Sequence, residues 1–206
     1  GKYKPVFSNQ LYTMRLIQLF LCTVVLALSL PVDCLNAQTS KKELREILKS
    51  LQKEKEIDVS ITFSQAIIHG KSEADFVYIE DISSEEDWIT LWENEYKPGL
   101  FRDLLGSFNN YMFDYGYRVR FGSFVQSKYQ IKLIVSSISE NGSVFMSGFI
   151  KKRDQEESLY ELTVYGRGGT FGSKINLMGD GFKRAGIDLA KQMISVFDRG
   201  KVGILY

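Results

Sequence analysis

The chain has 206 residues, of which 44% are hydrophobic and 25% are charged, and its formal net charge at pH 7 is +1. This composition is ordinary for a globular chain with one sizeable core, and it excludes a disordered or fibrous protein.

A segment near the amino terminus has the features of a secretory signal peptide. Met14 and Arg15 precede the apolar run LIQLFLCTVVLALSL, and small residues follow near Ala37. A short basic start, an apolar run and a small-residue exit are typical of such peptides. We therefore expect residues 14–37 to be removed on export to the periplasm or outer envelope, with residues 1–13 as an upstream extension. A retained amino-terminal anchor is the alternative.

Both cysteines, Cys22 and Cys34, lie in this segment. Cleavage after Ala37 would leave neither a disulfide nor a thiolate metal site. Lipidation of Cys34 would tether the protein to a membrane, but Pro31 and Asp33 occupy positions where a lipobox has leucine and a small residue. The remaining chain would carry 23 Lys and Arg against 24 Asp and Glu, a balance that gives no electrostatic footprint for nucleic acid.

Residues 38–56 form a predicted amino-terminal amphipathic helix. Ser40 and Glu43 have capping-box spacing, and Leu44, Ile47, Leu48 and Leu51 recur at helical intervals. A single apolar stripe is what docking onto the helix's own domain requires, and a partner-binding helix is the alternative.

The next segments alternate between predicted strands and helices. Residues 57–63 and 75–82 have strand-like patterns, and the acids of SSEEDWITLWENEY favour the start of a helix. These acids lack the spacing of a calcium loop. Pro98 and Gly99 are expected to end that helix, and a core helix is expected from Leu100 to a stop at Gly116.

After Gly116 the hydrophobic period changes to two. Strands are predicted at 117–121, 129–138, 143–150 and 159–165, with a hairpin turn at Asn141-Gly142 and a charged loop between the last two strands. A final helix is predicted to begin near Asp180. Residues 57–206 are thus expected to form a single α+β domain, with an antiparallel sheet of about four to five strands and helices packed on one face.

The glycine-rich stretch GRGGTFGSKINLMGDG (166–181) does not match a phosphate-binding loop. Ser173 precedes Lys174, which reverses the Walker order, and Phe171 occupies the third glycine position of the dinucleotide fingerprint. The sequence predicts no bound cofactor. Backbone contact of Gly168, Gly169 and the neighbouring Phe171 with a partner is one role for this stretch beyond reversing the chain.

The sequence contains no recognisable catalytic constellation. His69 is the only histidine, so no histidine-based metal site or Ser-His-Asp arrangement is expected. A carboxylate-dependent hydrolase would need Asp75, Glu80, Asp81 or Asp114 to converge in one cleft. The dense aromatic stretch near Gly116 offers Tyr111, Tyr115 and Tyr117 as a ligand surface, although such residues also cover sheet edges.

The order of elements from about Asp75 to Phe197 resembles that of small bacterial envelope domains, the curli-secretion-lipoprotein and TolB amino-terminal group. The segments LFRDLLGSFNNYMFDYGYRV, the strands from Tyr129 to Tyr165 and AGIDLAKQMI carry this resemblance. The tail from Gly166 and the sequence NAQ at 36–38 are also similar to uncharacterised secreted Bacteroidetes proteins. The resemblance implies a non-catalytic accessory or assembly role through contacts with an envelope protein. A secreted module that binds glycan or another small ligand is the alternative.

Overall fold

The structure is a computed structural model that describes residues 41–201. Its helices are α2 (Lys41–Gln52), α3 (Glu73–Ser83), α4 (Trp88–Leu91), α5 (Lys97–Asp114) and α6 (Lys174–Lys201), and a π-helical turn, η2 (Trp92–Tyr96), joins α4 to α5. Its strands are β1 (Glu56–Thr62), β2 (Ile67–Ile68), β3 (Lys71–Ser72), β4 (Arg120–Gly122), β5 (Tyr129–Ile138), β6 (Val144–Lys152) and β7 (Ser158–Gly166). The expected signal peptide, both cysteines and the expected Ser40 cap lie outside the described residues.

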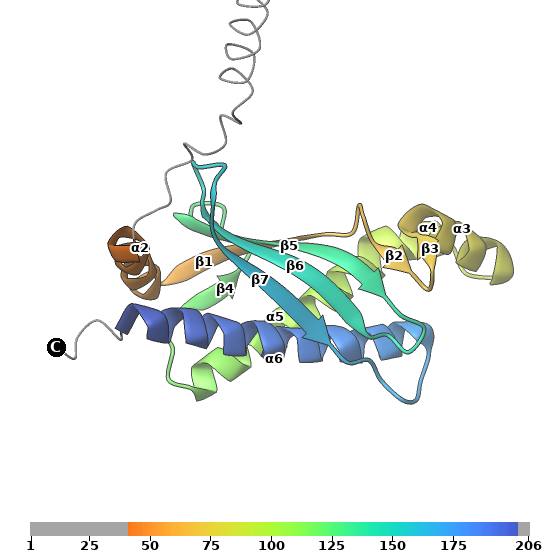
Figure 1. Ribbon diagram of the computed structural model, residues 1–206. Coiled ribbons are helices and arrows are strands. Elements are labelled where there is room, and N and C mark those ends of the chain that lie inside the picture. Colours follow the sequence, from red (N-terminus) through yellow and green to blue (C-terminus); the bar gives the residue numbers. More distant parts are fainter. Residues whose placement is uncertain (1–40, 202–206) are drawn as a thin grey trace, which may run out of the picture. The chain divides into compact units, whose positions relative to one another are not determined.

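The strands form one mixed sheet (Figure 1). β1 pairs in parallel with β4 and with β5, whereas β5, β6 and β7 pair antiparallel in chain order. β2 pairs in parallel with the carboxyl end of β5 and antiparallel with β3. The predicted α+β class is confirmed, but the expectation of a purely antiparallel sheet is wrong. Parallel pairing needs a long crossover, and the chain between β1 and β5 supplies one because it contains α3, α4 and α5.

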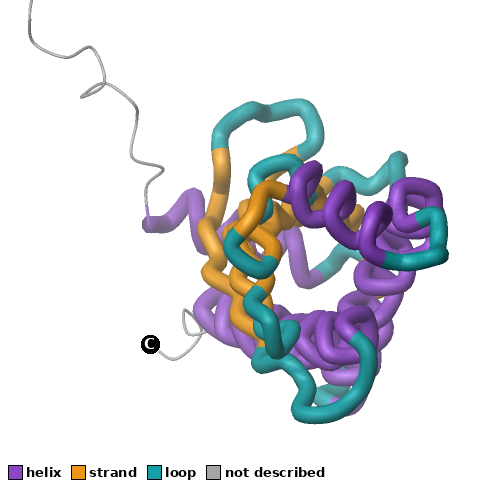
Figure 2. Tube along the Cα trace, turned by 90° about the vertical axis from the view of Figure 1, so that its right-hand side faces the viewer, coloured by secondary structure: helices purple, strands orange, loops and turns teal. Residues whose placement is uncertain are grey.

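Helices α5 and α6 lie side by side against one face of the sheet (Figure 1). In the view turned by 90°, the strands lie together and helices flank them on more than one side (Figure 2). The alternating residues Ile131, Leu133 and Val135 of β5 are buried beneath α5 and α6. The core also takes in apolar residues of both helices: Leu100, Leu104, Phe108, Met112, Phe182, Leu189 and Met193.

Helix α2 packs on its own domain, as its stripe predicts. Leu48 and Leu51 are buried in the core, the Gln52 side chain donates to the Phe197 carbonyl of α6, and the Tyr129 hydroxyl donates to Ser50 Oγ at 3.0 Å. The apolar stripe of α2 is therefore used within the domain and is not left free for a partner helix.

The predicted strand at 75–82 is wrong, because residues 73–83 form helix α3. Ser72 caps the helix by accepting a hydrogen bond from the Asp75 amide, and Glu73 and Asp75 lie in the first turn, where acids favour helix formation. The branched and aromatic residues that suggested a strand are divided between two helix faces instead.

Pro98 and Gly99 do not end a helix, contrary to the prediction. The chain stays helical from Trp88 to Asp114, and Pro98 stands at the start of α5, directly after the wide turn η2. Proline lacks an amide hydrogen, and a widened turn accommodates the missing bond. The helix begins at Trp88 with Asp87 as its cap, since the Asp87 carboxylate accepts from the Thr90 amide at 2.9 Å.

The final helix begins earlier than predicted. It starts at Lys174 rather than near Asp180, so the second half of the glycine-rich stretch is helical. The Asn176 amide donates to Ser173 Oγ at 3.3 Å, and the Leu177 amide donates to the Ser173 carbonyl at 3.0 Å. Ser173 is therefore a local start signal that the surrounding glycines obscured.

Strands β5, β6 and β7 and helix α5 match their predictions closely. Gly142 has a φ of 79° at the tip of the β5–β6 hairpin, and Gly116 has a φ of 84° where α5 ends, so both glycines occupy left-handed positions. The predicted strand at 117–121 is shorter than expected, because only Arg120–Gly122 pairs with β1.

Candidate functional site

Helix α3 is apolar on both of its faces. It buries Phe76 and Val77 toward the core, while Tyr78 and Ile82 on the outer side are 60% and 64% exposed. Exposed apolar side chains that gather on one face of a helix mark interaction surfaces. We call this area the α3–α4 surface and define it by four exposed apolar residues and two acids: Tyr78, Ile79, Ile82, Ile89, Asp81 and Glu85.

Two shallow clefts adjoin the α3–α4 surface. One, of about 420 Å³, lies between the end of β1 and the start of α5, and its lining includes Phe63 and Lys97. The other, of about 320 Å³, has Tyr78 and Ile89 among its lining residues. Both clefts are lined by Glu73 and Glu93, so they meet at these two side chains, and we call the two clefts together the groove.

The groove is held in shape by a half-buried charge cluster. Glu73 accepts hydrogen bonds from Trp92 Nε1 at 2.8 Å and from Lys97 Nζ at 3.0 Å, and Lys97 also pairs with Glu93. Burial opposes the charged form of Lys97, but the hydrogen bonds and charges of Glu93 and Glu73 outweigh it and raise its pKa. Because Lys97 stays protonated at neutral pH, the cluster serves as a structural cross-link between α3, η2 and α5.

The other end of α5 carries two exposed arginines, Arg118 and Arg120, and Arg120 pairs with Glu56. Arg118 lies over the Phe113 ring at 4.6 Å and Arg120 over the Phe124 ring at 5.6 Å, around a cleft of about 440 Å³. Asn109 anchors this region, since its side chain donates to the Phe121 carbonyl at 2.8 Å and accepts from the Phe121 amide at 2.9 Å. We call it the basic aromatic end and define it by five exposed residues: Phe113, Tyr115, Arg118, Arg120 and Val125.

The predicted tyrosine surface lies beside this end but does not form one platform. Tyr111 and Tyr115 stack with ring centroids 4.7 Å apart and hydroxyl oxygens 3.2 Å apart. Tyr117 instead leans on Phe197, and its hydroxyl donates to Asp198 at 3.2 Å. Of the three, only Tyr115 is largely exposed.

The backbone of the predicted partner-contact glycines, Gly168 and Gly169, already contacts other residues of the same domain. The Gly168 amide donates to Ser143 Oγ at 2.9 Å, and a Cβ added to Gly168 would overlap the Asn141 carbonyl. A Cβ on Gly169 would lie 2.7 Å from the Asp180 carboxylate. These glycines let the hairpin tip, the end of β7 and α6 approach at backbone distance. Phe171, by contrast, is 91% exposed.

The structure does not bring the tyrosines and the glycine-rich stretch together. Tyr117 contacts Asp198 near the carboxyl end of α6, whereas Gly169 donates to the Leu177 carbonyl near its amino end. About 20 helical residues separate these contacts, a distance of roughly 30 Å. Any contact that these two candidate regions make with partners is therefore separate.

The acids named as possible catalytic groups are also divided. Asp75, Glu80 and Asp81 belong to α3, whereas Asp114 ends α5. Asp75 accepts from Ser72, and Glu80 pairs with Lys174. Within residues 41–201, no group of three or more histidine, cysteine or acidic side chains is placed to hold a metal ion.

His69 lies in a two-residue turn between β2 and β3. His69 and Gly70 have φ values of 50° and 78°, the pattern of a type I′ hairpin. Its ring packs edge-on against Phe76, and its buried Nε2 has no hydrogen-bond partner among the described residues. Burial lowers the pKa of His69, with a further contribution from Lys174, while Glu140 and Glu80 oppose the shift.

A further cleft of about 550 Å³ lies where α5 and α6 begin. Arg102, Asp103, Asp180 and Lys183 line it, and Lys183 lies 3.9 Å from Asp103. With Glu95, the lining has three acidic and two basic side chains, so the cleft presents charges of both signs.

Sequence reasoning missed the α3–α4 surface and its charge. Residues 72–96 contain nine acidic residues and no lysine or arginine, and residues 115–139 contain four basic residues and no acid. A running charge count along the chain shows this separation. The incorrect strand at 75–82 hid the surface, because a helix brings Tyr78 and Ile82 next to each other one turn apart, whereas a strand would hold them about 13 Å apart.

Among residues 41–201, none of the helices is both long enough and apolar enough to cross a membrane. No protein-family model, curated protein or solved structure matches the chain. The resemblance to envelope domains of the curli-secretion-lipoprotein and TolB group therefore stays a prediction.

Proposed function

We propose that this chain is an exported, non-catalytic protein of the cell envelope that acts through protein–protein contacts in an accessory or assembly role. The observation that supports this proposal most directly is the α3–α4 surface. Its exposed tyrosine and isoleucines lie beside the groove, and exposed apolar patches of this kind mark interaction sites. Export is supported by the signal-like segment at residues 14–37.

The α3–α4 surface also indicates the chemistry of a fitting partner. Asp81 and Glu85 belong to the α3–α4 surface, so a partner that presents lysine or arginine next to apolar side chains complements that surface. Interfaces take most of their energy from a few buried anchors, and Tyr78 and Ile82 are the anchors offered here.

Co-purification from the envelope fraction tests this proposal. A Tyr78→Ser, Ile82→Ser double variant should lose proteins that co-purify with the wild-type chain, and its melting temperature should stay close to wild type because both side chains already face solvent. Phe145→Ser is the matched control, since Phe145 is an exposed aromatic residue of β6 that belongs to none of the candidate surfaces. Equal recovery of every protein with both variants would contradict the proposal.

A secreted glycan- or small-ligand-binding module is the second candidate. The stacked pair Tyr111 and Tyr115, next to Phe113 and Arg118, favours it, since sugars stack on exposed aromatic rings. A glycan panel should then raise the melting temperature of the wild-type chain but not of a Tyr115→Ala variant. A panel without any shift would exclude the glycans it contains.

A further inference from the structure

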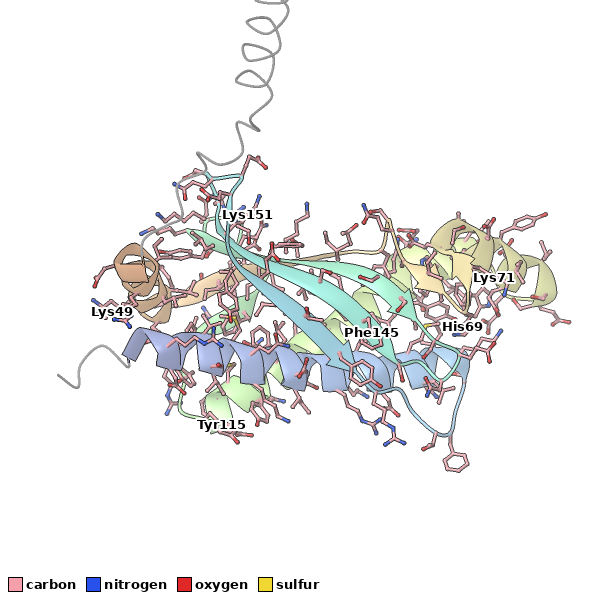
Figure 3. All side chains as sticks on the ribbon, viewed as in Figure 1. Lys49, His69, Lys71, Tyr115, Phe145 and Lys151 are labelled. Atoms are coloured by element: carbon pink, nitrogen blue, oxygen red, sulfur yellow. The ribbon has the colours of Figure 1, made fainter. Side chains whose placement is uncertain are left out.

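The near-zero net charge of the chain conceals two oppositely charged ends. The acidic stretch at 72–96 immediately precedes α5, and Arg118 and Arg120 follow its other end, where Arg120 pairs with Glu56 and Arg118 is the cation offered to a partner. Helix α5 has 18 residues, which separates its two ends by about 27 Å. Figure 3 shows the separation: Lys71, just before α3, and Tyr115, just after α5, lie at opposite ends.

Each charged end also exposes apolar side chains. The α3–α4 surface presents Tyr78 and Ile82, and the basic aromatic end presents Tyr115 at 60% and Val125 at 71% exposure. A protein interface typically has an apolar centre and a polar, charged rim. The two ends are therefore complementary in charge and alike in apolar character.

The acids at the carboxyl end of α3 are locally unfavourable for the stability of that helix. Glu80 and Asp81 lie in the last turn, which has no basic residue, so they face the negative end of the helix dipole. Lys174 compensates Glu80 through an ion pair. Asp81 lies next to Ile82 on the surface, where a cation from outside the molecule is the compensation that remains.

We propose that the occupant of the α3–α4 surface is a second copy of this chain, docked through its basic aromatic end. Arg118 of one copy then faces Asp81 and Glu85 of the next, while Phe113 and Val125 cover Tyr78 and Ile82. This inference uses the same surface as the proposed function and names its partner. Since the contact joins two different surfaces, each complex leaves one of each free, and assembly continues head to tail beyond a dimer.

Sedimentation velocity at low salt tests this proposal on the full chain, purified as the cell processes it. The wild type should form species larger than dimers as its concentration rises to about 100 µM, and these should dissociate when NaCl rises from about 50 to about 500 mM. Arg118→Glu should weaken association at least tenfold. Lys132→Glu makes the same charge change on the exposed side of β5 and should have no effect on association.

Mixing separates surface pairing from loss of structure. Arg118→Glu retains the α3–α4 surface, and an Asp81→Lys, Glu85→Lys double variant retains the basic aromatic end. Each variant alone should be monomeric, and an equimolar mixture should associate beyond dimers again, because one contact pairs Arg118 with Asp81 and Glu85 and the other pairs the introduced glutamate with the introduced lysines.

A monomeric wild type at about 100 µM, or association that survives both charge reversals, overturns the self-association proposal. Neither result decides the co-purification experiment. If the Tyr78→Ser, Ile82→Ser variant no longer co-purifies a different envelope protein, the proposed function is still supported.

Discussion

At the residue scale, His69 combines a left-handed backbone with a buried ring nitrogen. Its φ of 50° is the only positive value among described non-glycine residues. Histidine and asparagine tolerate this region better than most residues. Because the ring packs on Phe76 without a hydrogen-bond partner for Nε2, protonation there places a charge where only the neutral ring is accommodated.

We therefore predict that His69 makes the domain sensitive to acid. Its pKa is lowered from 6.5 by burial and by Lys174, so below about pH 6.5 the unfolded chain binds a proton more readily than the folded one. The free energy of unfolding should fall as pH decreases through this window. His69→Asn keeps the turn and removes the titration, so its urea midpoint should fall less between pH 7 and pH 5. An identical fall in both proteins would show that His69 is not responsible.

Gly168 is the residue at which the glycine-rich stretch admits no side chain. A Cβ there overlaps the Asn141 carbonyl, which belongs to the tip of the β5–β6 hairpin. Gly166 and Gly181 have the same kind of neighbour, since a Cβ on either would overlap a glycine carbonyl. The stretch is therefore rich in glycine because three backbone segments meet there.

Gly168→Ala should destabilise the domain by more than about 2 kcal/mol, because the hairpin tip must move to admit the methyl group. Gly106→Ala is the matched control: this site lies inside α5 with no atom within 4 Å of an added Cβ, so alanine should stabilise by about 0.5–1 kcal/mol. Urea unfolding measures both. A Gly168→Ala variant as stable as wild type would contradict the packing and would return this glycine to the role of partner contact.

At the element scale, helices and strands were predicted correctly where the sequence pattern that encodes them lies within a short segment. β5, β6 and their turn could be predicted because strict alternation and Asn141-Gly142 are complete within about 20 residues. The position of β1 between β4 and β5 depends on a crossover of more than 60 residues, and no local pattern encodes it. Helix α3 was missed because its apolar residues serve two surfaces, which removes the one-sided period of an ordinary helix.

The carboxyl end of α3 yields a prediction about stability. Asp81→Lys replaces an acid with a base beside the negative end of the helix dipole, so it should stabilise the domain by roughly 0.3–1 kcal/mol. Asp75→Lys, at the opposite end, should destabilise it, because Asp75 accepts from Ser72 and lies in the first turn. Denaturant unfolding of both variants measures whether the free energy of unfolding rises for Asp81→Lys and falls for Asp75→Lys. A less stable Asp81→Lys variant would mean that Asp81 has a stabilising partner within the domain.

At the scale of the whole molecule, the described residues place apolar groups and opposite charges at the two ends of one helix. The candidate residues Tyr117 and Gly169 were predictable as unusual features of the sequence, but their separation along α6 was not, since it depends on which end of that helix each one contacts. The α3–α4 surface was not predicted, because it exists only once residues 73–83 are helical.

Site-specific photo-crosslinking in the living cell tests the central claim most directly. A photoreactive residue at position 82 should crosslink to protein, whereas the same residue at position 134, on the sheet face away from α5 and α6, should not. Crosslinked mass then distinguishes a second copy from another envelope protein. Equal crosslinking at both positions, or none at position 82, would contradict the account of α3 and α4 as a protein-docking surface.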